Sequence, residues 1–249
     1  LTLISLANVI TTSFKAQAES VVSEVVKADY QISAAQVFVS PGIPTGLSDE
    51  LIALDEVTKL SRSRATIVGF EDRPLILGAV DEDIFDLIKT ENIAGSKEEF
   101  LKPNAMGVLK QKAERDNLGI GDEIILTIPE EGKRTFTIEY IFDWTTPPPA
   151  EFFLLLENYS FFSEESLDTE IYFNVKEKNE STQAKLDQIV SDYPGAKLRD
   201  QDGLVEEANT QIQQLLNVIY GFLSISIFVA LFGITNTLSL SVYERTREI

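Results

Sequence analysis

The sequence predicts an α+β domain on two helical stalks that are continuous with transmembrane helices. Residues 1–14 and 208–243 carry no charged side chain, whereas the segment from Lys15 to Glu207 holds the whole formal net charge of −19. Within that acidic segment, short stretches of alternating apolar residues are interspersed with stretches of helical periodicity. Strands and helices that occur separately in this way are typical of an α+β domain.

The composition excludes several kinds of chemistry. The chain contains neither cysteine nor histidine, so it has no disulfide, no thiolate metal site and no imidazole base. It lacks the phosphate-binding pattern G-x-x-x-x-G-K-[ST], so ATP hydrolysis would need a separate protein. Its acidic surface repels nucleic acid. We therefore expect a protein that is not an enzyme, with no catalytic, cofactor-binding or metal-binding residue, no cofactor and no nucleic-acid partner.

The apolar segment Leu215–Tyr243 is the candidate membrane span. Its 29 residues would form a helix about 43 Å long, which exceeds a hydrocarbon core of about 30 Å. Gly221 and Gly233 are of a type that suits helix contacts inside a bilayer. The alternative is a buried helix of a soluble protein, but such helices usually run to about 8–20 residues.

The first 14 residues are apolar but too short to span a membrane alone, and they lack the basic start of a signal peptide. We expect them to be the end of a spanning helix that continues as a stalk, mirrored by the segment before the second span. Apolar residues recur at three- and four-residue intervals on both stalks, so each set lies on one helical face. The faces expected to pack together are Phe14, Val21, Val22 and Val25 on the first stalk and Val205, Ala208, Ile212 and Leu215 on the second.

Basic residues near the membrane ends predict the orientation. Arg245 and Arg247 follow the second span closely, whereas the nearest basic residue before Leu215 is Arg199, so the C-terminal flank should be cytoplasmic. The acidic middle then lies outside, in a chain that crosses in–out–in. The expected divisions are 1–27 for the first membrane helix and stalk, 28–203 for the extracellular domain, 204–243 for the second stalk and membrane helix, and 244–249 for a cytoplasmic segment.

Several elements of the external domain are predicted from their periodicity and end signals. The expected strands are Ala28–Ala34, Val57–Gly69, Leu75–Val80, Glu123–Ile128, Thr135–Phe142 and Thr169–Val175. The expected helices are Ser48–Leu54 with Ser48 as N-cap, Asn104–Asn117, and Ser181–Tyr193 with Ala184, Leu186, Ile189 and Val190 on its buried side. Gly119 and Gly121 should form a turn after the second helix, and "PEEGKR" should close a hairpin.

Two external segments leave alternatives open. After three consecutive prolines, an apolar run is either a linker with a buried strand or an exposed surface for cargo or a partner. The residues of that possible surface are Phe152, Phe153, Leu155, Phe161 and Phe162. The acidic groups Glu71–Asp72 and Asp81–Asp83 could hold a hard cation, but they lack the spacing of a calcium loop, so solvated turns are the simpler interpretation.

The segment "GITNTLSLSVYERTREI" (233–249) closely resembles the end of the second membrane helix in FtsX-like, MacB-type ABC transporter permeases. The segments "SFKAQAESVVSEVVKADYQIS", "GVLKQKAERDNLGIGDEIILTI" and "DQDGLVEEANTQIQQLLNVIYGFL" are similar to the family's first stalk, helix–turn–strand and returning stalk. The resemblance covers nearly the whole chain and implies a MacB-type external core domain.

The resemblance also implies a role and partners. The chain would be a permease subunit in the cell membrane that relays motion of a cytoplasmic ABC ATPase to its extracellular domain, for export or extraction of hydrophobic cargo such as a lipid, lipoprotein, peptide or antibiotic. A second permease copy or half and membrane lipid would be further partners. Glu244, Arg245, Arg247 and Glu248 match the family's coupling segment; they could equally be a charge cluster that fixes the helix at the interface. The alternative function is an extracellular sensor or scaffold that binds a peptide or activates a cell-wall protein.

Overall fold

The computed structural model describes residues 12–13, 20, 22–34, 42–71, 73–145, 150–161 and 167–247. The chain divides into two compact units, one formed by Val21–Leu204 and the other by Leu1–Ser20 with Val205–Ile249.

The larger unit contains ten named strands and several short helices. The strands are β1 (Tyr30–Ala34), β2 (Val57–Phe70), β3 (Arg73–Val80), β4 (Thr90–Gly95), β5 (Ala105–Leu109), β6 (Glu123–Ile128), β7 (Gly132–Trp144), β8 (Phe152–Leu155), β9 (Asp168–Val175) and β10 (Ala196–Asp200). The helices are α2 (Thr45–Ile52), α3 (Ile84–Leu87), α4 (Lys97–Phe100), α5 (Lys110–Asp116), the 3₁₀ helix η1 (Leu156–Asn158) and α6 (Glu180–Ser191).

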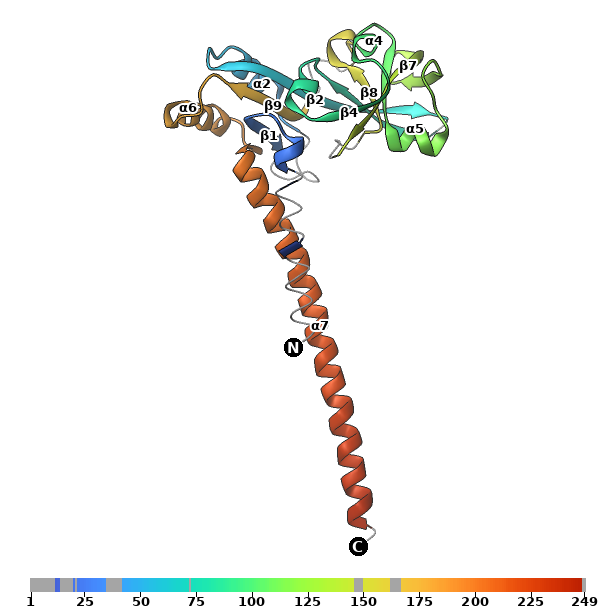
Figure 1. Ribbon diagram of the computed structural model, residues 1–249, viewed down its shortest axis with the longest axis vertical. Coiled ribbons are helices and arrows are strands. Elements are labelled where there is room, and N and C mark those ends of the chain that lie inside the picture. Colours follow the sequence, from blue (N-terminus) through green and yellow to red (C-terminus); the bar gives the residue numbers. More distant parts are fainter. Residues whose placement is uncertain are drawn as a thin grey trace. The chain divides into compact units, whose positions relative to one another are not determined.

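The first and last elements of this unit form a ferredoxin-like layer. They follow the chain order β1-α2-β2 and then β9-α6-β10, and the sheet order is β10-β1-β9-β2 with antiparallel neighbours. Figure 1 shows α2 and α6 beside β1 and β9. Leu51 of α2 and Leu186 of α6 belong to the same buried cluster as Ile32 and Phe173 of the sheet. Both helices therefore cover one face.

The insertion between β2 and β9 closes into a small barrel. Among the described strands, the pairing runs from β2 through β3, β8, β5, β7 and β6, and β6 returns to β2 where Gly69 pairs with Thr127. A Cβ on Gly69 would lie 3.1 Å from Thr127 Cβ, so the absence of a side chain permits this close approach. The interior holds apolar side chains that include Leu77, Met106 and Phe136. Closure removes two exposed strand edges.

Strand β2 belongs to both parts of the unit. Its first half, Val57–Arg64, pairs with β9 of the ferredoxin-like layer, and its second half, Ser63–Phe70, pairs with β3 of the barrel. A third cluster of aromatic side chains fills the space where the parts meet. Phe142, Trp144 and Phe153 pack there with tilted rings whose centroids lie 5.6–6.4 Å apart, in one cluster with Tyr172. A single strand thus fixes how the two parts connect.

Most strands expected from the sequence are confirmed. β1, β2, β3, β6, β7 and β9 match the six expected strands with small changes at their ends. The turn after α5 is confirmed as well: Asn117 caps the helix in the left-handed conformation and Gly121 has φ of 89°. β6 and β7 form the expected hairpin, in which Ile128 pairs with Gly132.

Three expectations about helices are wrong in detail. α2 begins at Thr45, so Ser48 lies inside the helix, where its hydroxyl contacts Asp168 instead of capping. The first third of the predicted helix Asn104–Asn117 is strand β5, because "AMGVL" is an apolar run that pairs with β7 and β8. Ala184 is exposed on α6, and Thr182 takes its place on the buried side.

Helix α7 (Gln201–Arg247) is 47 residues long and begins directly after β10 without a linker. Among the described residues, its segment Gln201–Ser239 is long and apolar enough to cross a membrane, with a mean hydropathy of 2.2 in its most apolar window. Only 6% of that window is buried within the protein. An apolar helix that the protein itself leaves uncovered is typical of a membrane span.

Candidate functional site

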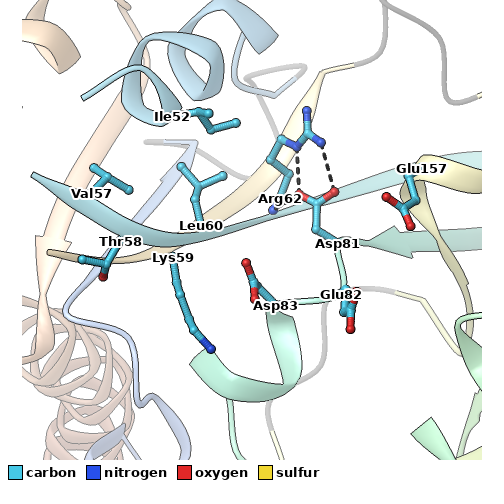
Figure 2. Close-up of a pocket in the computed structure, with 10 residues that line it drawn as sticks. All are labelled: Ile52, Val57, Thr58, Lys59, Leu60, Arg62, Asp81, Glu82, Asp83 and Glu157. Atoms are coloured by element: carbon cyan, nitrogen blue, oxygen red, sulfur yellow. Dashed lines mark hydrogen bonds and ion pairs between the residues drawn. The ribbon is translucent and has the colours of Figure 1, made fainter. Parts of the chain in front are cut away.

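A pocket of about 410 Å³ lies between α2, the start of β2 and the loop that follows β3 (Figure 2). Its lining residues are Ile52, Val57, Thr58, Lys59, Leu60, Arg62, Asp81, Glu82, Asp83 and Glu157. The ferredoxin-like layer supplies the residues up to Arg62, and the insertion supplies the four acidic residues. The pocket therefore forms where the two parts of the larger unit meet along β2.

One wall of the pocket is apolar. Ile52, the last residue of α2, is 54% exposed, and Val57 and Leu60 at the start of β2 are half-buried beside it. α2 ends at Ile52, and backbone hydrogen bonds from Ala53 and Leu54 back to the helix turn the chain toward β2. This turn leaves an isoleucine side chain over the pocket instead of in the core.

Both basic residues of the pocket are already paired. Arg62 donates from Nε to Asp81 Oδ2 at 2.8 Å and from Nη2 to Asp81 Oδ1 at 3.0 Å, and these hydrogen bonds raise the pKa of Arg62. Asp81 Oδ2 also accepts the backbone N–H of Arg62 at 2.8 Å. Lys59 pairs with Asp86 of α3, and this hydrogen bond raises the pKa of Lys59. Neither cation is available to bind an anion.

The opposite wall carries carboxylates without such partners. Glu82, Asp83 and Glu157 form no ion pair with any side chain in the described part of the chain. Figure 2 shows Glu82, Asp83 and Glu157 across the pocket from Ile52 and Val57. Glu82 and Glu157 are exposed, whereas Asp83 is half-buried. The pocket is therefore negative on one side and apolar on the other.

For the acidic turn Asp81–Asp83, the sequence left two alternatives open, a site for a hard cation and a solvated turn. Among the residues that the structure describes, no three acidic side chains are grouped so that they could hold a metal ion. Asp81 is occupied by Arg62.

A buried ion pair lies near the pocket and was not expected from the sequence. Arg64 donates from Nε to Asp168 Oδ1 at 2.7 Å, and Ser48 Oγ lies 2.8 Å from Asp168 Oδ2. The Asp168 side chain is fully buried. Burial raises the pKa of Asp168, and the hydrogen bonds from Arg64 and Ser48 oppose that rise. These contacts tie α2, β2 and the start of β9 together. The sequence signal for these contacts would have been that Ser48, Arg64 and Asp168 are polar residues among residues of the core.

The proposed apolar surface after the prolines is wrong. Phe152, Phe153 and Leu155 are buried, because β8 lies between β3 and β5 in the barrel wall. Phe161 is half-buried against the barrel core, and Phe162 lies outside the described residues. The interpretation that holds for β8 is the buried strand.

The residues expected to pack between the stalks differ in burial. Phe14 and Val21 lie outside the described residues, while Val22 is half-buried and Val25 is buried. On α7, half-buried positions include Val205, Ala208 and Ile212. Leu215 does not fit the expected face, because it is 64% exposed, whereas Leu216 is 5% exposed. The buried face on this turn therefore passes through Leu216.

The C-terminal segment continues the helix. Glu244, Arg245 and Arg247 are within α7, which ends at Arg247, and Glu248 lies outside the described residues. The placement of Glu244 and Glu248 on one helical face stays a prediction, because Glu248 is not described.

The fold is similar to that of solved transporter domains. The periplasmic region of MacB from Actinobacillus actinomycetemcomitans superposes with a TM-score of 0.53 at 10% sequence identity, covering 75% of this chain and 94% of that one. The extracellular domain of the ABC-type transporter YknZ from Gram-positive bacteria has a TM-score of 0.46 at 9% identity, covering 71% and 100% of the two chains. No protein-family profile and no curated protein matches the sequence. The chain thus has the fold of a MacB-type external domain. At this sequence identity, the similarity shows the fold alone.

Proposed function

We propose that this chain is the external domain and a membrane helix of an ABC transporter permease subunit that works with a separate cytoplasmic ATPase. The observation that carries the proposal is the junction of β10 and α7. A domain with the fold of the MacB periplasmic region runs directly into an apolar helix long enough to cross a membrane. Such a junction suits a domain that is held at a membrane surface and moved from below.

The location follows from the same junction and from the charges beside it. Arg245 and Arg247 lie at the C-terminal end of α7, and under the positive-inside rule they favour a cytoplasmic location for that end and an external location for the unit Val21–Leu204. We propose the divisions expected from the sequence, namely 1–27, 28–203, 204–243 and 244–249, in a chain that crosses in–out–in.

The proposed mechanism is mechanical. An unbroken helix of 47 residues is about 70 Å long and can carry a displacement that a flexible linker would absorb. Glu244, Arg245, Arg247 and Glu248 would contact the ATPase at the cytoplasmic end, and a second permease copy and lipid would surround the span. The packing expected between the two stalks stays a prediction.

The experiment that tests this proposal measures ATP hydrolysis. The full-length protein, isolated in mild detergent from the membrane of the organism that encodes it, should carry an ATPase activity. Reversing the coupling charges in Arg245→Glu with Arg247→Glu should remove that activity, because the charge at the proposed contact with the ATPase would change sign. The matched control is Lys133→Glu at the exposed start of β7, which should retain it. An isolated protein without ATPase activity, or equal losses in both variants, would contradict the coupling.

One observation favours the sensor or scaffold alternative over export of hydrophobic cargo. The apolar residues that could have received such cargo, Phe152, Phe153 and Leu155, form the barrel wall. The pocket beside β2 is instead lined by charged and apolar residues together. A domain of this kind suits recognition of a partly polar ligand, with the ATPase acting on the bound state.

A further inference from the structure

We propose that the pocket between α2, β2 and the loop after β3 binds a basic amphipathic peptide, holding one cationic and one apolar side chain. The proposal rests on the external location argued above and names the ligand of that domain. It concerns a site of about 410 Å³, within the range of about 300–1,000 Å³ in which proteins bind ligands.

The charge of the pocket selects a cation. Four carboxylates line it against two cations, and both cations are held by Asp81 and Asp86. Glu82, Asp83 and Glu157 remain for a ligand. An ammonium or guanidinium group beside any one of these carboxylates gains a charge-assisted hydrogen bond, whereas a phosphate or carboxylate would meet repulsion from all three. The net charge of −19 attracts cations to the domain from a distance.

The apolar wall selects the second feature of the ligand. Ile52 is 54% exposed, with Val57 and Leu60 half-buried beside it, so an apolar side chain placed there removes further hydrophobic surface from water. A small inorganic cation would leave this wall uncovered, and no three acidic side chains among the described residues are grouped for a metal ion. Ligands that carry both an aliphatic group and a cationic group therefore fit best.

The open form of the pocket favours a peptide. Ile52, Lys59, Glu82 and Glu157 are all exposed around it, so the pocket is open to solvent and does not enclose its ligand. In an extended peptide, side chains two residues apart point the same way at a separation of about 7 Å. A leucine and a lysine with one residue between them can thus reach the apolar wall and the carboxylates together.

The test measures binding to the full chain in nanodiscs of phosphatidylcholine, which carries no net charge that would attract the probe. The probe is a fluorescent peptide of repeated Leu-Ser-Lys-Ser, followed by anisotropy. One control peptide has serine in place of leucine, and another has glutamate in place of lysine. We expect saturable binding of the probe, clearly weaker binding of the leucine-free peptide and no binding of the acidic peptide.

Variants locate the binding. Removing the three free charges in Glu82→Gln, Asp83→Asn and Glu157→Gln should weaken binding about tenfold, since each exposed ion pair contributes about a factor of two. The control changes the net charge equally at exposed carboxylates elsewhere, in Glu91→Gln, Glu98→Gln and Glu123→Gln, and should bind as the unchanged protein does.

A second variant tests the apolar wall and keeps the proposal testable if the first variant misfolds. Ile52→Ser changes an exposed side chain and should weaken binding about threefold while leaving the fluorescence of Trp144 unchanged. Equal losses in the pocket variant and its control would show attraction to the acidic surface alone and overturn the proposal. Equal binding of the leucine-free peptide would overturn it too. Neither outcome would contradict the proposed coupling to the ATPase, because ATP hydrolysis is measured in a separate experiment.

Discussion

Replacing Phe153 with alanine should destabilise the larger unit strongly, because this side chain is at the meeting point of the barrel and the ferredoxin-like layer. Phe153 is fully buried on β8. Its ring centroid lies 5.7 Å from that of Phe142 and 5.6 Å from that of Trp144. A Cβ on Gly78 would come within 2.8 Å of its ring, so the ring rests directly on the backbone of β3.

The expected magnitude follows from the lost area and the lost ring contacts. Truncation removes on the order of 100 Å² of buried apolar surface, or about 3 kcal/mol at about 25 cal/mol per Å². Two aromatic contacts of about 0.5 kcal/mol or more bring the loss of unfolding free energy to about 4 kcal/mol, within the range of about 3–5 kcal/mol for buried phenylalanines. With an m-value of about 2 kcal/mol per molar urea, the unfolding midpoint should fall by about 2 M.

The assay is urea unfolding of the full chain in detergent micelles, followed by the fluorescence of Trp144, which is the sole tryptophan of the sequence. The matched control is Ile67→Ala on β2, whose side chain is 62% exposed, and its loss should stay below about 1 kcal/mol. If Phe153→Ala costs no more than this control, β8 is not part of the core, and the apolar surface suggested by the sequence would have to be reconsidered.

Three further predictions concern the backbone, the membrane and the pH. Gly95→Ala should lower the free energy of unfolding by about 3 kcal/mol in the same urea assay, because its Cβ would lie 2.0 Å from a backbone oxygen and its φ is +77°. Gly132→Ala, with φ of +88° and open space around its Cβ, should lower it by about 1 kcal/mol. Similar losses in the two variants would refute the clash at Gly95. A cysteine in place of Lys133 should react with an impermeant maleimide in intact cells and one in place of Thr246 should not, and the reverse pattern would overturn the orientation. Burial raises the pKa of Asp168 above its ordinary value of 3.8, so the folded state holds that proton more tightly than the unfolded state does. The stability that the proton contributes is present below the ordinary value and is lost as the pH rises through the raised pKa. As the pH rises from about 4, the urea midpoint of Asp168→Asn should therefore increase relative to that of the unchanged protein, and a constant difference would contradict the raised pKa.

The hairpin of β6 and β7 shows what local sequence could predict. Its strands alternate buried and exposed residues, and the turn residues lie at the positions where the chain reverses. Asn117 after α5 is a similar case, since asparagine tolerates the left-handed conformation that ends the helix. These signals are local because the backbone conformation of each residue and its nearest neighbours decide them.

Strand β5 shows where local sequence was insufficient. "AMGVL" has no alternation, because every residue of this strand is buried, and a fully apolar run of five residues fits a buried strand and a helix equally. Its state was decided by pairing with β7 and β8, which are more than twenty residues away in the chain. The same ambiguity affected Phe152 and Phe153, since a run of apolar residues does not say whether it faces the core or the solvent.

The sequence by itself determined the uncharged span after Leu215, the acidic charge of the external domain, the strands with alternating residues and the α+β class, because each depends on composition or on neighbours within one element. Only the tertiary structure decided that β2 joins two parts, that Ser48 and Arg64 meet Asp168, and that Ile52 and Asp83 line the same pocket. Those arrangements depend on pairing between segments that are far apart in the chain. The free energy that stabilises them comes from burial and hydrogen bonds that form on folding. The pattern within one segment does not show which distant residue will be the partner.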